Sequence, residues 1–145
     1  MTHTYFSAGR QWQASGSYYD ENGVSYKLSG LACLSRSQSE WTLDGHMEIK
    51  LDEPVRFHNK YQIHETSSAF TYRWTSYNPA LGVLKGTFDI IGDNIISVYT
   101  SESNEYSGTE TLIQVDENTY HNVGVSFRNG CRMSAWTAVL ISKAR

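Results

Sequence analysis

Polar and apolar residues alternate along most of the chain. The alternation is clearest from Glu40 to Asp52, where every second residue from Trp41 to Leu51 is apolar or glycine and the residues between them are polar. Successive side chains of a strand point to opposite faces of a sheet, so this stretch is predicted to be one long strand with a buried face and a solvated face. The same alternation, less regular, appears in residues 24–34, 55–63 and 70–75.

Turn-forming residues separate these segments at regular intervals. They cluster at residues 21–23, 78–79, 92–94, 116–118 and 128–130. Strands spaced by about 8–12 residues are typical of an all-β sandwich or barrel. Because successive short hairpins favour a meander and closure removes the sheet edges, we predict an antiparallel up-and-down β-barrel of about eight to ten strands. One barrel domain accounts for residues 1–145, with short helical turns expected only at residues 4–11 and 79–81 and a β-bulge at Asp44-Gly45.

The first turn fixes the register of the first two strands. Glu21-Asn22-Gly23 fits a three-residue hairpin loop in which the glycine takes the left-handed conformation and forms a bulge. This loop places Tyr18 opposite Tyr26 and Trp12 opposite Ala32. The two strands then agree on which face is apolar, which supports the predicted loop.

The distribution of charge excludes several kinds of partner. Lys and Arg number 12 against 15 Asp and Glu, and no basic run occurs that could bind a nucleic acid or an anionic membrane. No apolar segment is long enough to cross a bilayer, and the first ten residues lack the apolar stretch of a signal peptide, so a cytoplasmic location is expected. With only Cys33 and Cys131 in a reducing compartment, no disulfide is expected.

The opening of the first strand resembles that of the calycins. Trp12, Ala14, Gly16 and Tyr18 share one face and follow Gly9. The arrangement is similar to the G-x-W opening of calycins and lipocalins and to the G-x-W-x-G-x-G opening of nitrobindin-like barrels, although Gly9 lies three residues before Trp12 and Ala14 replaces a glycine. The resemblance implies a lipocalin-like barrel with Trp12 at its closed end. A barrel of eight or more strands can hold one small ligand inside.

The histidines provide one interior candidate. His46, His58 and His64 lie in the polar phase of their segments, and no zinc-type spacing of histidines or cysteines occurs, so neither a metal site nor a resident cofactor is predicted. His121 alternates in phase with the apolar residues at positions 123, 125 and 127, which places it inside the barrel. There it could act as a general base, hydrogen-bond a ligand or, as the nitrobindin resemblance implies, coordinate haem iron. A core histidine bonded to a tyrosine or to Gln114 fits the pattern as well.

Glu110 joins His121 as a candidate for proton transfer. The chain carries no G-x-S-x-G, GxGxxG or Walker motif, so the usual nucleophile and phosphate-binding signatures are absent. Glu110 faces the interior if the loop at Glu117-Asn118 has two residues, whereas a three-residue loop turns residues 109, 111 and 113 inward instead. The turn at 128–130 leaves the last strand open in the same way. One loop length turns residues 131, 133 and 135 inward, the other 132, 134 and 136.

Aromatic residues dominate the predicted interior. They occupy the inner faces of three successive strands, and Phe88 and Tyr99 continue the set. They either fill a small barrel or line a cavity that suits a flat, partly polar molecule. The leading hypothesis is binding of one small hydrophobic or aromatic molecule; a barrel enzyme (isomerase, cyclase or lyase) and a haem protein are the alternatives, and a homodimer is left open. The residues predicted to line the ligand are Trp41, Tyr61, Tyr72, Trp74, Tyr99, His121 and Met133.

Overall fold

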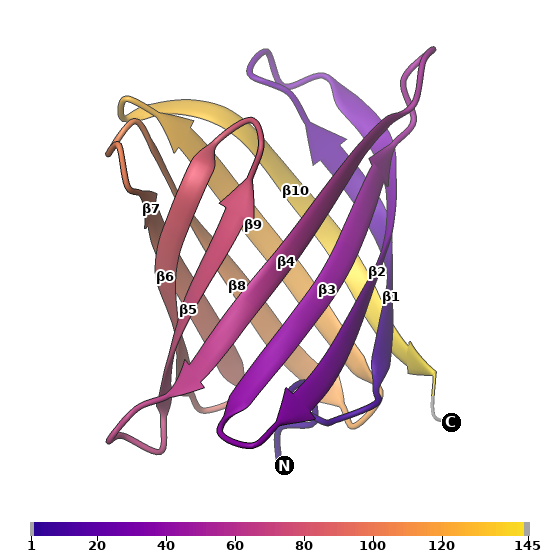
Figure 1. Cartoon of the computed structure of the whole chain (residues 1–145). Coiled ribbons are helices and arrows are strands. Elements are labelled where there is room, and N and C mark those ends of the chain that lie inside the picture. Colours follow the sequence, from indigo (N-terminus) through magenta and orange to yellow (C-terminus); the bar gives the residue numbers. More distant parts are fainter. Residues whose placement is uncertain (1, 144–145) are drawn as a thin grey trace.

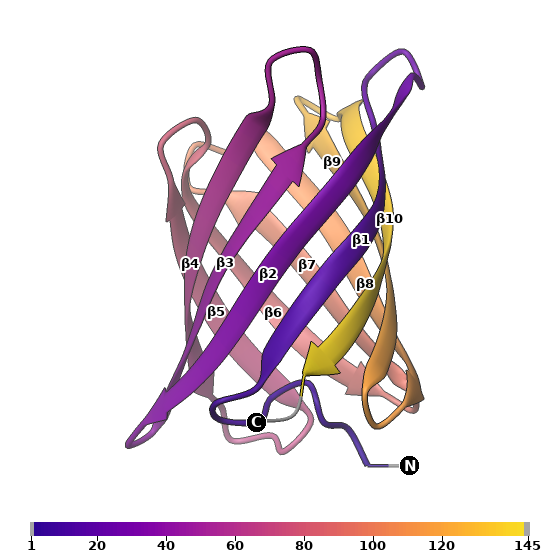
Figure 2. The same cartoon turned by 90° about the vertical axis from the view of Figure 1, so that its right-hand side faces the viewer.

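Ten antiparallel strands form a closed barrel in the computed structural model, which describes residues 2–143. Each strand pairs with its neighbours in sequence, and β1 pairs with β10 to close the sheet (Figure 1 and Figure 2). The predicted all-β up-and-down barrel is therefore confirmed. The strands are β1 (Gln11–Tyr19), β2 (Ser25–Ser37), β3 (Glu40–Ile49), β4 (Val55–Glu65), β5 (Thr71–Asn78), β6 (Gly82–Ile91), β7 (Asn94–Ser101), β8 (Tyr106–Asp116), β9 (Thr119–Arg128) and β10 (Cys131–Lys143).

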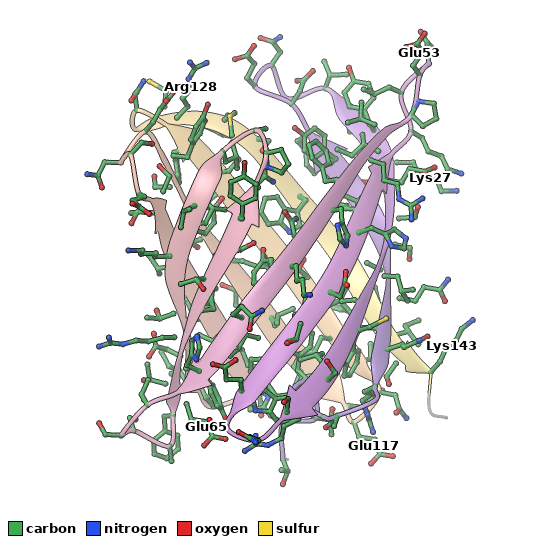
Figure 3. All side chains as sticks on the ribbon, viewed as in Figure 1. Lys27, Glu53, Glu65, Glu117, Arg128 and Lys143 are labelled. Carbon is green, nitrogen blue, oxygen red and sulfur yellow. The ribbon has the colours of Figure 1, made fainter. Side chains whose placement is uncertain are left out.

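The two ends of the barrel differ. The loops that follow β1, β3, β5, β7 and β9 lie at one end, which we call the open end. The N-terminal segment, residues 2–10, lies at the other end beside the remaining hairpin loops, and we call this the closed end (Figure 1). Figure 3 shows Glu53 and Arg128 at the open end and Glu117 at the closed end. The Glu117 carbonyl accepts hydrogen bonds from the side chains of Thr4 and Arg10, both at 2.7 Å, which ties the segment to the β8–β9 loop.

The Tyr120 hydroxyl also holds the N-terminal segment. It accepts hydrogen bonds from the backbone N–H groups of Thr4 and Tyr5, at 3.1 and 3.3 Å. His3 Nε2 donates to the Gly92 carbonyl at 2.8 Å, so in the neutral ring Nδ1 is left to accept the Tyr120 O–H, also at 2.8 Å. These bonds take the place of helical ones, and residues 2–143 contain no helix. The helical turns predicted at residues 4–11 and 79–81 are wrong.

Trp12 is completely buried at the closed end, where the calycin resemblance implied it would lie. Its ring stacks on that of Tyr5 with the centroids 5.5 Å apart and meets the Tyr120 ring edge-on at 5.2 Å. The indole N–H donates to the Tyr5 carbonyl at 3.2 Å, so its polar atom has a partner despite the burial. Trp12 pairs with Ala32 in the predicted register.

The β1–β2 hairpin follows the prediction throughout. Tyr18 pairs with Tyr26, and Gly23 takes a φ of 79°, which is the left-handed conformation that the loop requires. The Asp20 carboxylate supports the turn by accepting the backbone N–H groups of residues 22 and 24 at 2.9 and 3.0 Å. In β3, by contrast, pairing is continuous on both sides, so the bulge predicted at Asp44-Gly45 is wrong.

β9 turns inward the face opposite to the predicted one, and two β-bulges lie in the strands on either side of it. One lies at Val115, where the pairing shifts between Gln114 and Asp116, and the other at Met133. Each inserts one residue and thereby changes which side chains of β9 match the inner faces of its neighbours. Residues 120, 122, 124 and 126 are buried, and His121 is exposed together with the apolar residue at 123. The prediction that His121 lies inside the barrel is therefore wrong.

The outer face carries the other histidines and the thiols. His58 and His64 lie on the outside of β4, each beside a carboxylate of β3, as their polar phase predicted. Cys33 and Cys131 are both free. In the part of the chain that the structure describes, no helix is long and apolar enough to cross a membrane.

Replacing Trp12 with alanine should lower the free energy of unfolding by about 3–5 kcal/mol, because a large buried ring is lost from the closed end. Urea unfolding followed by circular dichroism measures the change. Tyr77→Ala is the control, since this ring is 66% exposed and its removal should cost less than about 0.5 kcal/mol. An unchanged unfolding midpoint in Trp12→Ala would contradict the packing of the closed end.

Candidate functional site

Two adjacent chambers occupy the barrel interior. The inner chamber, of about 140 Å³, reaches down to Tyr5 and Trp12 at the closed end. The outer chamber, of about 320 Å³, extends toward the open end, where Tyr18, Phe57 and Leu81 line it. Sites for small organic molecules have volumes of roughly 300–1,000 Å³, so the two chambers together are large enough for one such ligand. The side chains that line both chambers are Met47, Asn59, Tyr61, Tyr99, Glu110 and Trp136.

Aromatic rings lie over glycines of the neighbouring strands. Gly86 pairs with both Trp74 and Tyr99, and Gly124 pairs with Trp136. A Cβ added at Gly86 would lie 2.6 Å from the Trp74 ring, and one added at Gly124 would lie 2.1 Å from the Trp136 ring. Because glycine leaves this space free, the rings lie against the barrel wall and leave the lumen open between them.

Trp74 is fixed from two sides. Its indole N–H donates to the Ser97 hydroxyl at 3.0 Å, which satisfies the only polar atom of the ring. The Tyr61 ring stacks on it with the centroids 4.6 Å apart and the planes inclined by 29°. Tyr99, on β7, lies beyond β6 with its ring centroid 5.8 Å from that of Trp74. The three rings form one aromatic wall across β4, β5 and β7.

A carboxylate faces the chambers from β8. Glu110 is enclosed by the barrel, and the accessible part of its surface borders both chambers. Its Oε1 accepts a hydrogen bond from Asn122 Nδ2 at 3.1 Å, and Asn122 Oδ1 accepts one from the Trp136 indole N–H at 2.9 Å. Because an indole nitrogen can only donate, Trp136 fixes the orientation of the amide and so directs its N–H group at the carboxylate.

Burial raises the pKa of the Glu110 carboxyl from 4.5 to about 7, while the hydrogen bond from Asn122 acts in the opposite direction. The carboxyl therefore exists in both protonation states near neutral pH. Burial, together with the charge of Glu110, raises the pKa of Tyr99 to about 12 and that of Tyr61 beyond the usual range. Both phenols are neutral at physiological pH and can donate or accept a hydrogen bond.

The structure brings five of the predicted site residues to the chambers. They are Tyr61, Trp74, Tyr99, Glu110 and Met133. Glu117-Asn118 forms a two-residue loop, one of the two lengths considered, and the bulge at Val115 then pairs Glu110 with the inward-facing Gly124. Met133 reaches the outer chamber from its own bulge.

Three predicted site residues lie elsewhere. Trp41 and Tyr72 are inside the barrel but pack around Phe6 at the closed end, with ring centroids 6.4 and 5.0 Å from the Phe6 ring, and border neither chamber. They fill the core because the N-terminal segment inserts a ring between them. His121 lies on the outer surface of β9, which removes the iron ligand on which the haem interpretation depended.

Several lining residues escaped the sequence reasoning. Asn122 lies in a strand whose alternate residues are apolar, so the pattern assigned it to solvent. Phe57 and Asn59 lie in the alternating segment 55–63, but nothing in the pattern distinguishes them as ligand contacts. Trp136 belonged to one of the two registers left open for the last strand. The available signal was a glycine on the neighbouring strand opposite each tryptophan: Gly86 pairs with Trp74, and Gly124 pairs with Trp136.

Comparison with known proteins supports the fold assignment. The structure is similar to that of the S-type phycobiliprotein lyase CPES from Guillardia theta, with a TM-score of 0.62 over 96% of this chain and 89% of that chain. The fold is calycin-like. The two sequences share 8% identity, so this likeness concerns the fold alone. No protein-family model matches the sequence, and no curated protein matches it either.

Replacing Glu110 with glutamine should change how stability depends on pH. The raised pKa means that the contribution of Glu110 to stability is fully present below about pH 4.5 and is lost as the pH rises through about 7, where the enclosed carboxyl must ionise. The amide cannot ionise, so the variant should gain about 3 kcal/mol on the wild type between about pH 4 and pH 8.

Urea unfolding of both proteins at the two pH values measures this difference. Glu48→Gln, on the outer face of β3, is the matched control and should follow the wild type. If wild type and Glu110→Gln show parallel pH dependence, the pKa of Glu110 is not shifted by the barrel.

Proposed function

We propose that this protein binds one small hydrophobic or aromatic molecule in the two chambers of its barrel. The observation that carries the proposal is that aromatic rings lie flat against the barrel wall, over glycines of the neighbouring strands, and leave the lumen between them open. Ligand sites are typically concave and mostly apolar with a few polar groups that fix orientation, and these chambers have that composition. Tyr61, Trp74 and Tyr99 offer ring faces to a flat ligand, and Glu110 with Asn122 offers the polar contact.

A second function, proton-transfer catalysis, is favoured by one observation. Glu110 faces the chambers with a pKa of about 7, and a general acid or base works best when its pKa lies near the working pH. An isomerase, cyclase or lyase could use this carboxyl to move a proton on a substrate confined by the aromatic wall. The similar barrel of a phycobiliprotein lyase is compatible with such a role.

A neutral aromatic alcohol tests the binding proposal. We expect 1-naphthalenemethanol to quench tryptophan fluorescence saturably with one site per chain, because Trp74 and Trp136 border the chambers. Gly124→Ala should weaken binding about tenfold or more, since the new methyl group forces the Trp136 ring into the lumen.

Gly45→Ala is the matched control. Gly45 also lines the inner chamber, but the same methyl group there would lie 3.3 Å from its nearest neighbour, a backbone oxygen, and displace no ring, so the affinity should change by less than about threefold. Absence of saturable binding to the wild-type protein, or equal loss in both variants, would refute the proposed site.

A further inference from the structure

Glu110 is the one Asp, Glu, Lys or Arg side chain that lines either chamber among residues 2–143. The titratable groups that face it are the phenols of Tyr5, Tyr61 and Tyr99, from the N-terminal segment, β4 and β7. His46 borders the inner chamber through β3, but it pairs with the exposed His58 in the outward phase of that strand. Among the described residues, the chamber walls therefore hold one carboxylate and no lysine or arginine.

Only one of the two oxygens of the Glu110 carboxylate accepts a hydrogen bond from the described residues. Oε1 accepts the hydrogen bond from Asn122, and Oε2 makes no hydrogen bond to any residue from 2 to 143. A carboxylate can accept about four hydrogen bonds, and leaving one enclosed without partners is costly. Within residues 2–143, no side chain donates to Oε2, and the chamber walls hold no lysine or arginine to balance the charge.

We infer that the ligand is an organic cation, an amine or a protonated nitrogen heterocycle on an aromatic or alicyclic body, whose N–H group binds the Glu110 carboxylate. This inference rests on the proposed function and specifies its ligand class. An ammonium group within the chambers gives Glu110 both the donor and the opposite charge that the protein does not supply, and charge-assisted hydrogen bonds are the stronger kind.

The aromatic wall favours the same class. The faces of aromatic rings attract cations, most strongly in sites that exclude water, and the combination of several rings with one acid is suited to an alkylammonium group. Tyr61 and Tyr99 lie close enough to Glu110 for its charge to act on both, and Trp136 joins it through Asn122. A cation at Glu110 would therefore lie among ring faces.

The same features disfavour anions. A fatty acid or aromatic carboxylate would bring a second negative charge beside Glu110, with no lysine or arginine on the chamber walls of the described chain to compensate. Two carboxyl groups in such a site must share a proton, so an anionic ligand would bind only with proton uptake. The barrel thus selects against the carboxylate ligands that a purely apolar cavity would tolerate.

Three ligands of one shape test the inference. Isothermal titration calorimetry at about pH 8 compares 1-naphthylmethylamine, 1-naphthalenemethanol and 1-naphthoate. We expect the amine to bind about tenfold or more tightly than the alcohol, and the carboxylate more weakly than both. Lowering the pH to about 5.5 protonates Glu110 and should weaken binding of the amine about tenfold, although the amine itself stays charged.

Glu110→Gln should remove both the preference for the amine over the alcohol and the pH dependence of amine binding, because the amide carries no charge at either pH. Glu48→Gln, which removes an outer-face carboxylate of β3, should behave as wild type.

The outcomes separate the two proposals. If none of the three ligands binds, the proposed function fails together with the inference. If the alcohol or the carboxylate binds as tightly as the amine, the inference alone fails. The comparison of ligands and its pH dependence use the wild-type protein, so they decide the matter even if Glu110→Gln does not fold.

Discussion

The contact between aromatic rings and cross-strand glycines determines the shape of the interior. The diameter of a barrel grows with its number of strands, so ten strands enclose a wider lumen than eight. Large rings that crossed this lumen would close it. Gly86, Gly108 and Gly124 instead leave the backbone bare beneath Trp74, Tyr99 and Trp136, so each ring lies on the wall. The lumen stays open, and the rings present their faces to it.

This arrangement also sets the electrostatics of the site. The wall of rings keeps water from Glu110, which is why its pKa rises although Asn122 donates to it. The closed end contributes to the same effect, because Trp12 and the N-terminal segment held by Tyr120 seal the barrel beneath the inner chamber. The Glu110 carboxyl is enclosed, accepts a hydrogen bond at one of its two oxygens and has a pKa of about 7. Its protonation state therefore changes readily when a charged group enters the chambers. The packing of the closed end thus contributes to the burial of Glu110 and also forms the floor of the inner chamber.

Much of the fold could be predicted from the alternation of polar and apolar residues, but β9 could not. The pattern rule assumes a polar outer face. Over β7 to β10 the outer face is apolar, with Val98, Val123 and Ile141 each about half exposed, so the rule selected the wrong side of β9. The bulges at Val115 and Met133 then shifted the pairing by one residue, and no local signal marks either. The sequence placed Glu110 inside only if the loop at Glu117-Asn118 has two residues, as it does. That condition gave the observed face because two errors cancelled: the inward phase of β9 was wrong by one residue, and the bulge at Val115 shifts the partner of Glu110 by one residue to Gly124.

The sizes of the residues indicate which face of β9 points inward, whereas their polarity does not. In a barrel that encloses a cavity, interior positions can be polar provided that they bond to one another, as Ser126 does with Ser134 and Asn122 with Trp136. Polarity therefore loses its value as a guide to the inside of such a strand. A tryptophan on one strand still needs a small residue beside it on the next if its ring is to lie flat. Applied to β9 and β10, this requirement pairs Trp136 with Gly124, turns the Tyr120–Ser126 phase inward and brings Asn122 to Glu110. The glycine and aromatic positions of the sequence thus contain the register that the hydrophobic pattern obscures.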